Sequence, residues 1–322
     1  MDQDAPIVTI IGGSGFVGRY IAWHMARRGW RVRVACRRPN TAGFVRAYGV
    51  VGQVEPVQCN IRDDASVAAV MRASDVVVFS VGVLADSGKN TFEAVQAEGA
   101  ARSARLAAAE GVERFVKISA IGADHRSPAR YGRTKAQGED AVLEHFPEAT
   151  ILRPSVVFGA EDQFFNRFAS MARLSPVIPI VGGATRFQPV YVGDVAEAAA
   201  KACAGEVEAG TYELGGPTVY TFREIVELTL RVIRRRRFIL DMPFWLGYLQ
   251  GRVLKYLPNP PITDDQVALL ERDNVVSKGA RGFKALGIEP AGPEGIIERY
   301  LVRFRPRGQY DEMIESARGR KS

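Results

Sequence analysis

Short apolar runs alternate with longer amphipathic stretches over the first half of the chain. The runs are rich in valine and isoleucine, whereas the stretches between them carry apolar residues at helical spacing. Strands are therefore expected at residues 7–11, 31–35, 54–59, 75–83, 114–119 and 149–154. The stretch 91–111, between two of these strands, is rich in alanine and predicts a long helix. This alternation predicts an α/β fold with a Rossmann-type, doubly wound parallel sheet.

The second half of the chain has shorter elements, which predict a smaller α/β C-terminal domain. Helices are expected at 163–174, 195–204 and 221–233, with a strand at 211–216. Asp194 is expected to cap the second of these helices. The stripe of Phe164, Phe165, Phe168 and Met171 is expected to pack in a core rather than bind substrate. The expected division is a dinucleotide-binding domain at 1–159, the smaller domain at 160–304 and a basic tail at 305–322.

The turn after the first strand carries a glycine-rich, phosphate-binding pattern, GGSGFVG. It follows an apolar strand and opens a helical segment, which is the context in which such a pattern indicates a dinucleotide site. Gly12 permits the turn, Gly15 lets the backbone approach a pyrophosphate, and Gly18 lets the helix pack closely. The free N–H groups at the helix start attract phosphates. The expected cofactor contacts here are Gly12, Ser14, Gly15, Phe16, Val17 and Gly18. The structural alternative is a strand–helix turn without a ligand.

The exit of the second strand, Ala35-Cys36-Arg37-Arg38, has no carboxylate. Enzymes that select NAD place an acidic residue there, against the ribose 2′-hydroxyl. The guanidinium groups of Arg37 and Arg38 match a 2′-phosphate in charge and in bidentate geometry. A solvated basic loop is the alternative, but the position favours NADPH as the cofactor.

Tyr131 and Lys135 are spaced one helical turn apart, so their side chains share one helix face. An ammonium group in that position lowers the phenol pKa and can also hold the ribose of a nicotinamide nucleotide. The spacing alone is weak, and it gains meaning only after the glycine pattern and the alternating strands. Lys135 serves as a ribose ligand with or without catalysis.

Composition and charge narrow the choice of partners. The chain has 322 residues, 47% hydrophobic residues and a net charge of +7, as in a mildly basic globular protein. Its three cysteines are scattered and odd in number, which suits a reducing compartment and no metal site. No membrane-spanning run, signal peptide or nucleic-acid motif is evident, so we expect a protein that binds no nucleic acid. Anionic lipid headgroups and acidic protein surfaces remain candidate partners.

A basic run, Arg234–Arg237, precedes a segment rich in apolar and aromatic residues, 238–257. A helix is expected after Pro243, with Asp241 as its cap. Its apolar positions and aromatic flanks are Leu246, Leu249, Val253, Leu257, Phe244, Trp245, Tyr248 and Tyr256. Charged residues interrupt the segment, so it should lie against an interface rather than span a bilayer. An ordinary core helix beside a solvated basic loop is the alternative.

The GxxGxxG spacing with YxxxK resembles the extended branch of the short-chain dehydrogenase/reductase superfamily. That resemblance implies an adenine site at Asn60 and Ile61, backbone against ribose at Val81 and Gly82, and nicotinamide-side contacts at Ser119 and Pro154. It also places Ala120 where the family keeps a catalytic serine. Ser119 is then a shifted stand-in or a structural residue, and we favour the structural role. No catalytic residue is assigned; Tyr131, Lys135 and Ser119 are vestigial candidates.

Within that superfamily, most of the chain resembles one atypical group, the nucleotide-binding accessory subunits of respiratory complex I in their bacterial form. The segments that carry this resemblance are GGSGFVGRYI, ISAIGAD, YGRTKAQGE, ILRPSVVFGAEDQFFNRFASMARLSP and TRFQPVYVGDVAEA. The resemblance implies a tightly held NADPH, a structural role without substrate turnover, and other complex I subunits as partners. It further implies a peripheral location on the cytoplasmic face of the bacterial inner membrane. Two alternatives stay open: a free-standing NADP-dependent reductase, epimerase or dehydratase, and a redox-sensing NADPH-binding regulator.

Overall fold

The computed structural model describes residues 4–254, 262–306 and 308, and it divides into two compact units. The first unit consists of Met1–Ser155, Val192–Gly215 and Val276–Glu289. The second consists of Val156–Tyr191, Gly216–Val275 and Pro290–Ser322. These units differ from the continuous division expected at residue 159. The reason is that β11 (Gly210–Leu214) pairs with β6 (Thr150–Pro154), which returns a later segment to the first unit.

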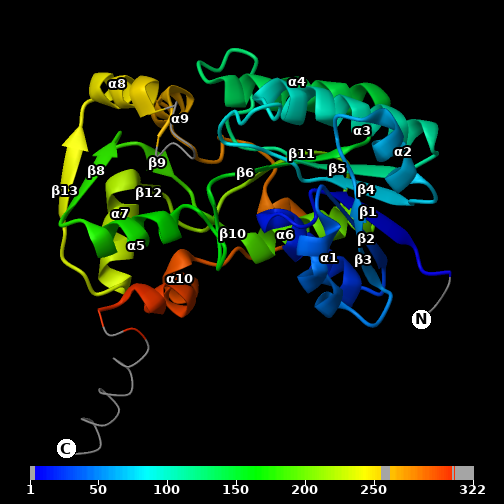
Figure 1. Cartoon of the computed structure of the whole chain (residues 1–322), viewed down its shortest axis with the longest axis horizontal. Helices are drawn as coiled ribbons and strands as arrows, with labels where there is room; N and C mark the ends of the chain where they lie inside the picture. The colour runs from blue at the N-terminus through cyan, green and yellow to red at the C-terminus, as the bar shows by residue number, and fades with distance from the viewer. Residues whose placement is uncertain (1–3, 255–261, 307, 309–322) are drawn as a thin grey trace, which may run out of the picture. The chain divides into compact units, whose positions relative to one another are not determined.

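A seven-stranded sheet in the order β11-β6-β5-β4-β1-β2-β3 forms the centre of the first unit, and all its pairings are parallel (Figure 1). Its other strands are β1 (Ile7–Ile11), β2 (Arg31–Cys36), β3 (Val54–Gln58), β4 (Val76–Phe79) and β5 (Arg114–Ile118). The strand order reverses at β1, which has β2 on one side and β4 on the other. Open sheets of this kind bind ligands at such a switch point, at the carboxyl ends of the strands. The predicted Rossmann-type fold is confirmed.

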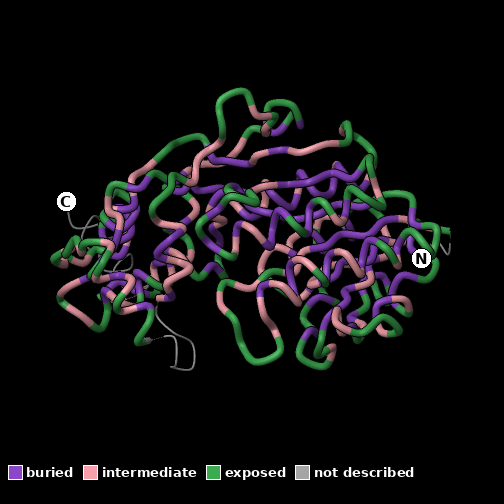
Figure 2. Tube along the Cα trace, turned by 90° about the horizontal axis from the view of Figure 1, so that it is seen from above, coloured by how far each residue is buried: buried purple, intermediate pink, exposed green. Residues whose placement is uncertain are grey.

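Helices cover both faces of this sheet (Figure 1). They are α1 (Phe16–Arg27), α2 (Asp64–Met71), α3 (Glu98–Ala109), α4 (Arg130–His145) and α6 (Val192–Cys203). Shorter turns are η1 (Pro39–Thr41), η2 (Gly43–Tyr48), η3 (Glu93–Ala97) and η4 (Phe283–Leu286). Buried aliphatic residues of the strands meet the small residues of the helices, and Figure 2 shows the buried positions gathered in the interior. The long helix predicted at 91–111 is confirmed: the π-helical turn η3 runs directly into α3, and helical residues follow one another from 92 to 109.

The second unit contains three two-stranded sheets: β7 (Val157–Phe158) with β10 (Val190–Tyr191), β9 (Arg186–Phe187) with β12 (Tyr220–Thr221), and β8 (Val177–Val181) with β13 (Phe238–Met242). Its helices are α5 (Phe165–Leu174), α7 (Phe222–Val232), α8 (Phe244–Leu254), α9 (Asp264–Leu270) and α10 (Pro293–Leu301), followed by η5 (Val302–Phe304). Phenylalanines dominate its core. Phe165 and Phe168 are buried, and Phe164 stacks on Phe222, so the predicted stripe packs in a core.

Two predicted helix caps are wrong. Asp194 lies inside the first turn of α6, because that helix begins at Val192. Asp241 lies in strand β13, opposite Ile180 of β8, and its carboxylate pairs with Arg223. The predicted positions Tyr256 and Leu257 lie outside the described residues. Among the helices that the structure describes, none combines the length and the hydropathy needed to cross a membrane.

Candidate dinucleotide site

The glycine-rich loop connects β1 to α1 through a tight turn. Gly12 has a φ of +82°, which L side chains rarely adopt, and its N–H donates to the carbonyl of Ala35 at 2.9 Å. A Cβ at Gly18 would overlap the carbonyl oxygen of Gly12, so the helix can pack this closely only with glycine there. Helix α1 begins at Phe16, directly after the extended Gly15. The first N–H groups of α1 are therefore available to an anion, as the sequence predicts.

Arg19, near the start of α1, stabilises this loop by hydrogen bonds, a role that the sequence analysis missed. Its Nε and Nη2 donate to the carbonyls of Gly15 and Ser14, both at 3.1 Å. Its guanidinium carbon lies 4.7 Å from the centroid of the Phe44 ring, which belongs to η2. The loop shape thus depends on a residue four positions beyond Gly15, a spacing that could have indicated this contact.

A pocket of about 370 Å³ opens at the end of β2, lined by Ser14, Arg37, Arg38 and Thr41. Both arginines are exposed, and the Thr41 hydroxyl donates to the Arg38 carbonyl at 3.0 Å. Two guanidinium groups and two hydroxyls around one hollow provide donors of the kind that bind a phosphate. The sequence analysis identified three of these four residues and missed Thr41.

Asn60 and Ile61 follow β3 at the same edge of the sheet. The Asn60 side-chain oxygen accepts from the backbone N–H of Arg62 at 3.2 Å, which stabilises the turn. Ile61 is half-buried and packs against α3, where a Cβ at Gly99 would lie 3.0 Å from its Cδ1. Their position is compatible with an adenine site, which stays a prediction.

Tyr131 and Lys135 lie on α4 beside the ends of β4 and β5. The Lys135 Nζ donates to the Ile118 carbonyl at 3.3 Å and lies 5.7 Å from the centroid of the Tyr131 ring. A Cβ at Gly82 would lie 3.4 Å from the same Nζ, so these three predicted residues are neighbours. Because Lys135 is almost fully buried, desolvation lowers the pKa of its ammonium group to about 8. Val81, also predicted, is half-buried against the sheet core.

The Ser119 hydroxyl is engaged in a buried ion network. It donates to the carboxylate of Glu139, which also accepts from the Arg153 Nε at 3.0 Å. The bond to Glu139 is the first cause of the raised pKa of Arg153. Ala120 follows, and it is buried and has no hydroxyl. The Pro154 carbonyl of β6 accepts from the backbone N–H of Ile121 at 3.0 Å, which closes this side of the site.

A second buried lysine lies in the middle of β5. Lys117 has no exposed surface, and its Nζ lies 4.9 Å from the centroid of the Phe79 ring. Desolvation, reinforced by the charge of Lys135 and opposed by Glu139, lowers the pKa of Lys117 to about 7. The sequence analysis missed this residue, although a lysine inside the apolar strand RFVKIS is an available signal.

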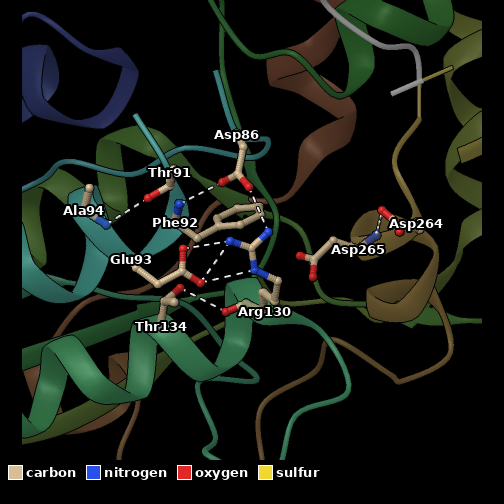
Figure 3. A network of polar contacts seen from close by, with 9 residues as sticks. All are labelled: Asp86, Thr91, Phe92, Glu93, Ala94, Arg130, Thr134, Asp264 and Asp265. Carbon is tan, nitrogen blue, oxygen red and sulfur yellow. Dashed lines mark hydrogen bonds and ion pairs between the residues drawn. The ribbon is translucent and has the colours of Figure 1, made fainter. Parts of the chain in front are cut away.

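Arg130 holds the start of α4 to the segment before α3, and Figure 3 shows its guanidinium between two carboxylates. Nη1 donates to Asp86 at 2.8 Å, while Nη2 donates to Glu93 at 2.7 Å. The bond to Arg130 is the first cause of the lowered pKa of Glu93. The backbone N–H of Phe92 donates to Asp86 at 2.9 Å, so the network orders both segments. This contact places Tyr131, the next residue of α4, and sequence reasoning missed it.

Comparisons with known proteins agree with this geometry. The family described as NAD dependent epimerase/dehydratase matches residues 8–215. The chain is 34% identical to "NADH dehydrogenase (ubiquinone) 1 alpha subcomplex subunit 9, mitochondrial" of Arabidopsis thaliana, over 94% of this chain and 79% of that protein. It is also 34% identical to the "NADH-ubiquinone oxidoreductase 40 kDa subunit, mitochondrial" of Neurospora crassa, over 94% and 80%. The UDP-glucose 4-epimerase of Thermus thermophilus in complex with NAD has a similar fold, with a TM-score of 0.69 and 20% identity over 93% and 99% of the two chains.

Proposed function

The chain belongs to the NAD dependent epimerase/dehydratase family, and we propose that it binds NADPH without substrate turnover, as an accessory subunit of respiratory complex I. The observation that carries this proposal is the contrast between an intact phosphate site and an incomplete catalytic one. The glycine cradle and the arginine pocket fit a dinucleotide phosphate. At the end of β5, however, Ala120 offers no hydroxyl, and that of Ser119 is bound to Glu139.

Different residues of the candidate site would bind different parts of NADPH. The start of α1 would face the pyrophosphate, and Arg37 and Arg38 would bind the 2′-phosphate. Asn60 and Ile61 would hold the adenine, and Lys135 the nicotinamide ribose. When bound, NADPH supplies a hydride donor. A developing oxyanion near the nicotinamide would lack one hydroxyl donor here, and loss of such a donor typically lowers a rate by about 10²–10³.

A free-standing NADP-dependent reductase or epimerase is the second candidate, because Tyr131 and Lys135 still form a pair in which Lys135 is buried and its pKa is lowered. Turnover of NADPH with aldehydes, ketones or sugar nucleotides, abolished by Tyr131→Phe, would establish this function in place of the proposed one. We expect no turnover in the wild-type chain with any of these substrates.

We further propose that the second unit attaches the protein to the membrane surface, beside other complex I subunits, on the cytoplasmic face of a bacterial inner membrane. Trp245, Leu249 and Val253 are 67%, 53% and 63% exposed and recur at every fourth position of α8, so they share one face. Exposed apolar residues at this spacing suit the interface between headgroups and acyl chains. Of the basic run, Arg235 and Arg237 donate to the carbonyls of Phe304 and Ala172. These bonds join the basic run to η5 and α5 of the same unit.

The proposed assembly is tested by affinity purification of the tagged full-length chain from gently solubilised membranes. Mass spectrometry should identify complex I subunits among the co-purified proteins. A second preparation with Trp245→Ser and Leu249→Ser should bind NADPH as before and leave the membrane fraction. A wild-type chain that elutes as a soluble monomer or dimer with no complex I subunit would contradict the proposal.

A further inference from the structure

The positive charge of the chain is concentrated in one stretch near its start. Between Asp4 and Glu55 the sequence contains eight arginines and neither aspartate nor glutamate. This stretch therefore carries a charge of +8, whereas the whole chain carries +7. It forms β1, α1, β2 and the turns η1 and η2. The candidate phosphate pocket uses Arg37 and Arg38, which leaves six arginines for other roles.

Three of these six arginines are bonded within the first unit. Arg28 pairs with Glu206, just after α6, and Arg46 pairs with Glu55 at 3.3 Å. Arg33 is half-buried and donates to two backbone carbonyls at the end of α2. The carboxylates of Glu206 and Glu55 thus mark the two borders of the basic region.

Between these borders, helix α1 presents a face of aromatic and basic side chains. Phe16, Tyr20, Trp23 and Arg27 recur at intervals of three or four positions, so they share one side of the helix. The buried residues of α1 lie on its other side. Figure 1 shows α1 and α6 together on one face of the sheet, with α3 and α4 on the opposite face.

Arginines of α1 hold the aromatic rings of this surface in place. The guanidinium carbon of Arg27 lies 4.9 Å from the centroid of the Trp23 ring. That of Arg19 lies 4.7 Å from the centroid of the Phe44 ring, on η2. Such cation–π contacts restrict the rotamers of both partners, so the rings and the positive charges are already ordered side by side.

The turn after η2 extends the same surface. Gln53 is buried, and its Nε2 donates to the carbonyls of Ala26 and Trp30 at 2.7 and 3.0 Å, which fixes the turn at the end of α1. Val50 and Val51 of this turn are 63% and 99% exposed. We call this surface the α1–η2 face; its members are Arg19, Tyr20, Trp23, Arg27, Phe44 and Val51.

We propose that the α1–η2 face docks an acidic surface of a protein partner. Tryptophan, tyrosine and arginine are the side chains that contribute most of the affinity at protein interfaces. Because the stretch that forms this face contains no carboxylate, carboxylates of a partner would complement its charge and increase the rate of encounter. The ordered rings and guanidinium groups reduce the entropy lost when the partner binds.

The exposed fractions of the rings favour a protein over a lipid surface. Trp23 and Phe44 are 37% and 41% exposed and lie against guanidinium groups, whereas Trp245 of α8 is 67% exposed. An aromatic ring that enters the headgroup region must project from the fold, and the rings of the α1–η2 face do so less than that of Trp245. This docking surface belongs to the first unit and needs no bound NADPH, so it goes beyond the proposed function.

The partner is identified by photo-cross-linking of the full-length chain in the cells that produce it. p-Benzoylphenylalanine replaces Ala47, which is exposed on η2 three positions after Phe44 and therefore on the same side of this 3₁₀ turn. Mass spectrometry of the adduct locates the linked peptide. We expect a protein adduct whose linked segment has more aspartate and glutamate than lysine and arginine. An adduct on a neutral or basic segment, or the absence of a protein adduct, overturns the proposal.

Variants of the α1–η2 face test whether its charge and rings hold the partner. Arg27→Glu with Trp23→Ser should lower the yield of the adduct at least about tenfold. The matched control is Arg126→Glu with Leu143→Ser, which makes the same charge change and removes an apolar side chain of 36% exposure elsewhere on the first unit. The control should keep the wild-type yield. Equal yields in the two variants overturn the proposal, and Arg27→Glu alone replaces the double variant if thermal unfolding shows that it is not folded.

Vesicles and RNA test the two other classes of polyanion. The chain with Trp245→Ser and Leu249→Ser, which removes the proposed membrane contact of α8, is mixed with vesicles of phosphatidylcholine and phosphatidylglycerol in equal amounts, or with oligouridylate. Neither probe should bind through the α1–η2 face. Binding of either probe that is lost on adding Arg27→Glu overturns the proposal. An acidic partner from outside complex I would contradict the proposed assembly and still support the docking inferred here.

Discussion

The two ends of the candidate dinucleotide site hold their charges in opposite ways. At the end of β2, Arg37 and Arg38 line a pocket and are exposed, so their guanidinium groups are open to solvent or to a ligand. Under α4, Lys117 and Lys135 are buried, and desolvation lowers the pKa of both ammonium groups. A charge in water has little influence on the stability of the fold, whereas a buried charge influences stability and function together. The phosphate end should therefore tolerate changes that the ribose end does not.

The largest expected change in stability comes from Lys117→Met, at the buried end of the candidate site. The pKa of Lys117 falls from its ordinary 10.5 in the unfolded chain to about 7 in the folded one. Between these pH values the unfolded chain binds more protons, so the free energy of unfolding rises with pH across this window. Lys117→Met should remove much of that rise and increase the free energy of unfolding at pH 7 by roughly 4 kcal/mol, from a pKa lowered by about 3.5 at about 1.4 kcal/mol per pKa unit. Urea unfolding at pH 7 and pH 9 measures both quantities, and a loss of stability at pH 7 would show that the amine is stabilising.

Gly138→Ala should destabilise the first unit by roughly 3 kcal/mol, the upper part of the range for overpacked cores. The new Cβ would overlap the backbone oxygen of Gln96 and press on Lys117. Thermal unfolding of the variant measures the loss. Gly295→Ala is the matched control, because it lies in helix α10 with no heavy atom within 4 Å of the added Cβ. Gly295→Ala should leave the stability unchanged or raise it slightly. An equal loss of stability in both variants would show that the packing around Gly138 is not unusually close.

At the phosphate end, Arg37→Ala with Arg38→Ala should weaken NADPH binding by about 1.5–3 kcal/mol, or roughly 10- to 150-fold. NADH, which lacks the 2′-phosphate, should bind wild type and variant alike, and the melting temperature should stay unchanged. Isothermal calorimetry with both nucleotides gives these values. Arg46→Ala supplies the control, since this arginine is exposed on neighbouring η2 and pairs with Glu55. Equal affinities of the wild type for NADPH and NADH would refute the assignment of the pocket.

The smallest effect is expected at Arg130, whose side chain is 44% exposed although it bonds two carboxylates. Arg130→Gln should lower the free energy of unfolding by about 1 kcal/mol or less, since exposed ion pairs contribute little. A double-mutant cycle with Glu93→Gln isolates the pair, and its coupling energy should be smaller than the effect at Lys117. A coupling above about 2 kcal/mol would mean that this exposed network behaves like the buried one.

Sequence reasoning succeeded where local pattern decides the structure. The strands of the first unit, the turn at Gly12 and the neighbouring positions of Tyr131 and Lys135 follow from hydrophobic period, glycine geometry and helical spacing. It failed where residues far apart in the chain meet. The bond between Arg130 and Glu93 spans 37 positions, and that between Arg153 and Glu139 joins a strand to a helix. The cap assigned to Asp241 failed for the same reason, because pairing of β13 with β8 outweighed the helix signal at Pro243.

The return of β11 to the edge of the first sheet has a consequence for synthesis of the protein. A ribosome makes the chain from residue 1 onward, so β6 leaves the exit tunnel about sixty residues before its neighbour Gly210–Leu214, as the sequence positions show. During that interval β6 presents an unpaired edge, the kind of surface on which nascent chains associate wrongly. Helix α6 and the turn η4 also join this unit late. Slow translation between residues 155 and 215 would prolong this exposure, so the yield of folded protein should depend on codon usage in that stretch.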